Sequence, residues 1–252
     1  MQTLARISAA AILFACALVA HAASPGTLLV LNKSDNTVSL VDLASKKSVA
    51  TIPTGSGPHE VAVSTDGRTA VVCNSGSQLS PGSTLTVIDV RARKASRTID
   101  LQQYRRPHGI AWLRGNEVAV TTEGSKTLLI VDVDAGKVTT AIETDQNGSH
   151  MVALAPKHDR AFVANIGSGS VSVIDLKTKQ RVANIPSGTG TEGIDVSPDQ
   201  REVWATNRGG HGFDHRRRFF QNRRDRRLEV VPDPSEIHRR RQARPGLERA
   251  VG

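Results

Sequence analysis

Apolar and polar residues alternate with a period of two along most of the chain. The alternation runs through Thr37–Asp42 (TVSLVD), Ser48–Ile52, His59–Ser64 and Thr69–Asn74. Successive side chains of a β-strand point to opposite faces, so this pattern indicates half-buried strands. The Asp66-Gly67 pair between the last two runs is typical of a tight hairpin turn. With no sustained helical period in the sequence, we predict an all-β fold.

The strand pattern repeats along the chain. Four similar stretches begin at Asn36, Ser83, Lys126 and Gly169, and they share the aspartates Asp42, Asp89, Asp132 and Asp175, spaced by 47, 43 and 43 residues. Four antiparallel strands in a tandem repeat of about this length are typical of β-propeller blades. We therefore predict a β-propeller of four-stranded antiparallel blades, with about four blades visible over residues 23–207.

Two structural expectations follow from the repeat. Val61 and Val63 share one face of a strand, and we expect both to face the packing between blades. The asparagines at the ends of strand-like runs are expected to bind backbone groups of turns; they are Asn74, Asn165 and Asn207.

The repeat unit can be compared with a known family. The segments Val171–Gly188 (VSVIDLKTKQRVANIPSG) and Ala161–Asp175 (AFVANIGSGSVSVID) resemble the YVTN-type, YncE-like repeat of bacterial periplasmic β-propellers and of their lactonase-like relatives. The resemblance covers about residues 26–207. It implies a seven-bladed ring in an intact relative, so that four blades would form an incomplete ring. The matching residues are structural, and the resemblance therefore bears on fold more than on activity.

The N-terminus has the features of an export signal. Arg6 precedes the apolar run Ile7–Ala20, and Ala20-His21-Ala22 fits the small-x-small cleavage rule. We predict a signal peptide at residues 1–22, no membrane span, and a periplasmic or secreted protein. The alternative is a lipoprotein with Cys16 as the lipidated residue.

Residues 208–252 differ sharply in composition from the rest. They contain thirteen arginines and no lysine, whereas residues 1–207 hold 20 Lys and Arg against 18 Asp and Glu. Codons for His211–Arg216 (HGFDHR) can be shifted by one base to read TVSTID, which is the repeat. We interpret this range as an out-of-frame, non-native Arg-rich tail, the result of a frameshift that truncates the propeller. The alternative is a genuine basic tail for nucleic acid or acidic surfaces; the near-neutral remainder indicates no nucleic-acid partner.

Four polar residues occupy one place in successive repeat units. They are His59, His108, His150 and Glu192, each just before the apolar run expected to form the innermost strand of its blade. Propeller symmetry would place all four around the mouth of the central channel. Imidazoles with a carboxylate could bind a small ligand, an anion or a transition metal, with metal binding at His59, His108 and His150. Alternatively, each histidine has only a structural role and hydrogen-bonds the backbone of a neighbouring blade. The sequence does not identify a cofactor.

Two functional hypotheses remain open. The first is an exported binding or scaffold propeller, monomeric when intact, whose partner is an unknown small molecule or periplasmic protein. The second is a metal-dependent, lactonase-like hydrolase or another propeller enzyme, for which no catalytic residue can be assigned. Cys73 lies in an apolar run, which favours a small buried side chain over a nucleophile.

Overall fold

The computed structural model describes residues 26–208, 217–221 and 228–231. The predicted signal peptide lies outside these ranges. The described residues form strands almost throughout, with one short 3-10 helix, η1 (Pro156–His158). No helix in this part of the chain has the length and apolar character needed to cross a bilayer.

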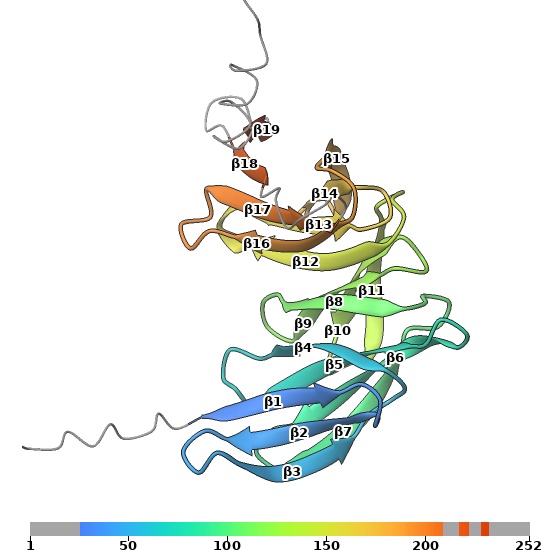
Figure 1. Ribbon diagram of the computed structural model, residues 1–252, viewed down its shortest axis with the longest axis vertical. Coiled ribbons are helices and arrows are strands. Elements are labelled where there is room, and N and C mark those ends of the chain that lie inside the picture. The colour runs from blue at the N-terminus through green and yellow to red at the C-terminus, as the bar shows by residue number, and fades with distance from the viewer. Residues whose placement is uncertain (1–25, 209–216, 222–227, 232–252) are drawn as a thin grey trace, which may run out of the picture.

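Five antiparallel sheets follow one another in chain order (Figure 1). The first sheet has three strands: β1 (Thr27–Asn32), β2 (Thr37–Asp42) and β3 (Lys47–Pro53). The second comprises β4 (Pro58–Val63), β5 (Thr69–Gly76), β6 (Pro81–Asp89) and β7 (Lys94–Asp100). The third comprises β8 (Pro107–Trp112), β9 (Glu117–Thr122), β10 (Thr127–Asp132) and β11 (Lys137–Glu143). The fourth comprises β12 (Ser149–Ala155), β13 (Arg160–Asn165), β14 (Ser170–Asp175) and β15 (Gln180–Pro186).

The fifth sheet includes residues from the range interpreted as out of frame. It comprises β16 (Thr191–Val196), β17 (Glu202–Asn207), β18 (Arg217–Gln221) and β19 (Leu228–Val231). Strand β18 pairs with β17 and β19 pairs with β18, so the backbone continues the four-stranded pattern. The frameshift is a hypothesis about the gene and stays a prediction.

The sheets are arranged as propeller blades. Strands β4, β8, β12 and β16 contact one another in succession, whereas β3, β7, β11 and β15 lie at the opposite edges of their sheets (Figure 1). Each blade is a meander of strands joined in sequence order. The predicted all-β propeller of four-stranded antiparallel blades is therefore confirmed.

The repeated aspartates stabilise one type of turn in the first four sheets. Asp42 Oδ1 accepts a hydrogen bond from the Ser45 backbone N–H at 2.7 Å, and the other three aspartates accept equivalent bonds from Ala92, Ala135 and Thr178 at 2.8–2.9 Å. A short side chain that binds backbone N–H groups fixes such turns. The shared aspartates are thus explained by the connection between the last two strands of each of these sheets.

Apolar clusters fill the space between adjacent sheets. The cluster between the first two sheets is formed by Val38, Leu40, Ile52, Ala70, Val72 and Ile88, all at most 2% exposed. Burial of one such Val, Leu or Ile side chain contributes about 1.5–3 kcal/mol. Val61 packs against this cluster as predicted, but the prediction for Val63 was wrong because it is 40% exposed. Val63 ends β4 beside the hairpin turn, where the packing between sheets gives way to solvent.

Two of the three asparagines, Asn74 and Asn165, bind hydroxyl groups, which corrects their expected role in turns. Asn207 Nδ2 donates to the backbone carbonyl of Ser187 at 2.7 Å, as predicted. Asn165 is fully buried, and its Nδ2 donates to the Oγ atoms of Ser170 at 3.1 Å and Ser172 at 2.9 Å on β14. Asn74 binds Thr84 and Thr86 on β6 in the same way. These bonds tie the second and third strands of a blade together through their side chains.

Candidate functional site

A β-bulge directs the candidate residues of all four inner strands. In β4, Pro58 pairs with Asn74 and Val61 pairs with Val72, so that His59 and Glu60 together oppose one residue of β5. The same register shift occurs in β8, β12 and β16, at His108, His150 and Glu192. A bulge re-aims the side chain that it carries out of the regular alternation. The four candidate residues therefore lie within the inner strands, at equivalent irregular positions.

The three imidazole rings form a continuous row, which we call the histidine row (His59, His108 and His150). The ring centroids of His59 and His108 are 4.0 Å apart, and those of His108 and His150 are 3.9 Å apart, with interplanar angles of 46° and 36°. His108 and His150 are buried, whereas the His59 side chain is 30% exposed. Glu192 continues the row, because its Oε1 lies 3.5 Å from Nε2 of His150. The structure thus brings the four predicted residues together.

The row also contacts a carboxylate that the sequence analysis did not identify, Glu123, which hydrogen-bonds with His150. Glu123 Oε1 lies 2.6 Å from Nδ1 of His150, and its Oε2 accepts from Nε and Nη2 of Arg106 at 3.2 and 2.9 Å. An ionised carboxylate only accepts hydrogen bonds, so Nδ1 of His150 carries the proton. The side chain of His150 therefore binds a carboxylate of the preceding blade, not its backbone as the structural alternative supposed.

The electrostatics of the row keep His108 neutral and Glu123 ionised. Burial, followed by electrostatic interactions with His150 and His59, lowers the pKa of His108 to about 3. Burial alone would raise the pKa of Glu123, but its hydrogen bond with His150 and the charges around it outweigh burial and lower the pKa to about 2. The row therefore combines a neutral imidazole with a fixed negative charge at neutral pH.

Two nitrogen atoms in the row are buried without a hydrogen-bond partner among the described residues. They are Nδ1 of His59 and Nδ1 of His108. Glu60 Oε1 lies 3.5 Å from Nδ1 of His59 without forming a hydrogen bond. A buried polar atom normally has a partner, and leaving it without one costs free energy. A ligand bound at this end of the row would consequently supply the missing partners and remove that free-energy cost.

The position of Glu123 does follow the repeat. It comes directly after Thr122, the last residue of β9, and Ser75, Ile166 and Arg208 follow the corresponding strand-ending asparagines. The Ser75 hydroxyl donates to the carbonyl of Pro107 in the next blade, and Arg208 Nε lies 3.2 Å from Glu192 Oε2. Alignment of this second position across the units could have identified Glu123.

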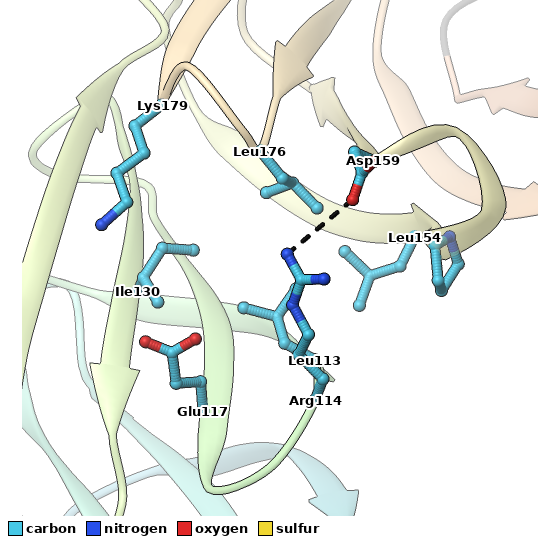
Figure 2. Close-up of a pocket in the computed structure, with 9 residues that line it drawn as sticks. Leu113, Arg114, Glu117, Ile130, Leu154, Asp159, Leu176 and Lys179 are labelled. Carbon is cyan, nitrogen blue, oxygen red and sulfur yellow. Dashed lines mark ion pairs between the residues drawn. The ribbon is translucent and has the colours of Figure 1, made fainter.

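A separate hollow lies between the third and fourth sheets (Figure 2). Leu113, Leu154 and Leu176 line it, and Arg114 and Asp159 form an ion pair of 3.7 Å across it. Leu113 directly follows β8, whereas His108 lies near the start of that strand, so this hollow and the histidine row are at opposite ends of β8. Its charged groups include both signs, Arg114 and Lys179 against Glu117 and Asp159.

Cys73 makes no contribution to the row. It is a free cysteine with no exposed surface, on β5 in the cluster between the second and third sheets. Burial raises the pKa of its thiol well above the usual value, so that the reactive thiolate is disfavoured.

Comparison with known proteins agrees with the observed architecture. Residues 3–116 match the family described as YNCE-like beta-propeller. A seven-bladed beta-propeller protein of Mycobacterium tuberculosis, Rv1057, is 28% identical over 110 residues, which are 42% of this chain and 28% of that protein.

Two solved structures have a similar fold. Hydrazine synthase of Kuenenia stuttgartiensis superposes with a TM-score of 0.67 and 19% identity, over 82% of this chain and 62% of that chain. A functionally unknown protein of Desulfotomaculum acetoxidans gives a TM-score of 0.67 and 18% identity, over 81% and 64% of the two chains. The chain thus spans less than two thirds of each of these relatives. The tandem repeats, the succession of four-stranded blades and these matches together identify the chain as a β-propeller whose residues 3–116 are similar to the YncE-like family.

Proposed function

We propose that this protein is an exported β-propeller that binds a ligand or partner on the axial face formed by the inner strands. The observation that carries the proposal is the histidine row itself. Three imidazoles from three blades are held 3.9–4.0 Å apart, and two of their nitrogen atoms are buried without a partner among the described residues. An arrangement that helped folding alone would be expected to pair these atoms.

The surroundings of the row support a binding function. Binding sites usually combine convergent polar groups with perturbed pKa values, and the row has both in His108 and Glu123. The matched family and curated relative are named for their fold, so they give no support to the lactonase-like alternative. The basic residues Arg106 and Arg208 each pair with a carboxylate beside the row, which leaves the imidazoles as the distinctive groups.

Native mass spectrometry of the full chain, purified without chelators from cells that export it, would test the proposal. We expect a non-covalent adduct on the wild-type protein that is lost in His108→Ala. The matched control is His158→Ala, which removes an exposed histidine of η1 away from the row. An adduct equally present in both variants, or none on the wild-type protein, would refute binding at the row.

Export forms the second half of the proposal and rests on residues 1–22. Cell fractionation should place the protein outside the cytoplasm, and N-terminal sequencing should begin at Ala23. Retention of Met1 in the cytoplasmic fraction would contradict export without affecting the binding test.

A further inference from the structure

The geometry points to a divalent transition-metal site of the Zn²⁺ class at one end of the histidine row, formed by His59, Glu60 and His108. This inference rests on the proposed binding function and names the chemistry of its ligand. It differs from a site of three imidazoles, because a carboxylate takes the place of His150.

The three residues can offer one donor atom each, and these atoms lie within 4.8 Å of one another. Zn²⁺ binds imidazole nitrogen and carboxylate oxygen at about 2.0–2.2 Å, which places tetrahedral ligands roughly 3.3 Å apart. The remaining difference requires only a small movement of side chains. His59 and Glu60 have that freedom, since their side chains are 30% and 35% exposed.

The bulge in β4 makes the ligand set possible. In a regular strand, the adjacent residues His59 and Glu60 would point to opposite faces of the sheet. Both lie in the bulge between Pro58 and Val61, and the Glu60 carboxylate consequently comes within 3.5 Å of the His59 ring. Two imidazoles and one carboxylate leave the coordination of a Zn²⁺ ion open at a fourth position, which water ordinarily takes.

The unpartnered nitrogen atoms provide the second, independent observation. His108 is 4% exposed, and its Nδ1 has no hydrogen-bond partner among the residues that the structure describes; the same holds for Nδ1 of His59. A cation would satisfy a lone pair on each ring. An anion would instead be repelled by Glu60, which makes a cation the better occupant.

A second grouping in the row is less suitable for a metal. His108, Glu123 and His150 also offer donors within 4.8 Å of one another. There, Glu123 already binds His150 at 2.6 Å and Arg106 at 2.9 Å, so a cation would have to break the first contact and lie close to a guanidinium group. We therefore place the ion between His59 and His108.

Calorimetric titration of the full chain with Zn²⁺, after removal of metals with a chelator, tests this assignment. We expect one tightly bound ion per chain, and a tetrahedral visible spectrum when Co²⁺ replaces Zn²⁺. Because loss of even an outer partner of a metal site weakens affinity by about 10–100-fold, His59→Ala, His108→Ala and Glu60→Gln should each weaken binding by at least about tenfold. His158→Ala should leave the titration unchanged.

Glu60→Gln is the decisive variant, because the substitution is isosteric and the Glu60 side chain is 35% exposed. A loss of affinity in Glu123→Gln with none in Glu60→Gln would overturn the assignment in favour of the second grouping. Absence of one-to-one binding in the wild-type protein would overturn it altogether. If Zn²⁺ fails to bind but native mass spectrometry still shows an adduct that depends on His108, the metal assignment fails and the proposed binding function stands.

Discussion

Acidification should destabilise the protein through His108 well before its carboxylates are protonated. Burial holds the pKa of this histidine near 3 in the folded state, compared with about 6.5 in an unfolded chain. The unfolded state therefore binds a proton as the pH falls below about 6.5, whereas the folded state does not. Stability is complete above that pH and is progressively lost as the pH falls toward 3.

The size of the loss follows from the two pKa values. At about pH 5 the unfolded chain is almost fully protonated at this position and the folded protein is not, which lowers the free energy of unfolding by about 2 kcal/mol relative to neutral pH. Glu123 adds a second loss at lower pH, because its folded pKa of about 2 lies below the ordinary glutamate value of 4.5. Its contribution is present above about pH 4.5 and is lost as the pH falls through the folded pKa.

Urea unfolding of the wild-type protein and of His108→Gln, at neutral pH and at about pH 5 with chelator present, would measure this effect. The other titrating groups are common to both proteins and largely cancel in the comparison. The wild-type protein should lose about 2 kcal/mol more than the variant on acidification. Equal losses in the two proteins would mean that His108 accepts a proton in place, and the account of a buried neutral ring would be wrong.

Three further substitutions test the architecture of the blades. Asn165→Ala should lower the free energy of unfolding by about 1–3 kcal/mol, measured by urea unfolding, because it removes two buried hydrogen bonds to β14. Gly109→Ala should cost about 1–3 kcal/mol and weaken ligand binding at the row, because its Cβ would lie 2.5 Å from the carbonyl of His150; unchanged stability would show that the inner strands can separate freely. Gly67→Ala should cost only about 1 kcal/mol by thermal unfolding, since the turn has φ +70° but open space around it; a larger loss would mean that this turn is packed.

The sequence predicted the blades well because their determinants are local. Alternation along Thr37–Asp42 sets which side chains face the neighbouring sheet, and the repeated aspartates mark the same turn in each unit. The grouping of His59, His108, His150 and Glu192 was also predictable, because equivalent positions of a propeller lie side by side.

The remaining features depend on register and on neighbouring blades. A bulge is set by which backbone groups pair across two strands, so alternation would place Glu60 on the face away from His59. Glu123 reaches His150 from the end of a strand in the preceding blade, a contact that no local pattern reveals. Alternation also predicted one contact that does not exist. It placed Val63 in the interior, because alternation carries no information on where a strand meets solvent.

The recurring bulge also keeps the residues of the row out of the apolar clusters between the sheets. His59, His108, His150 and Glu192 each occupy an irregular position of an inner strand, outside the regular pairing with the neighbouring strand. A substitution at one of these positions changes the chemistry of the axial face while the flanking ladder and the clusters between sheets stay intact. Each of these four blades thus contributes one polar side chain from an equivalent position. Evolution or engineering could compose new recognition surfaces on this scaffold by altering a single residue per repeat, as the fourth member of the series already does with glutamate in place of histidine.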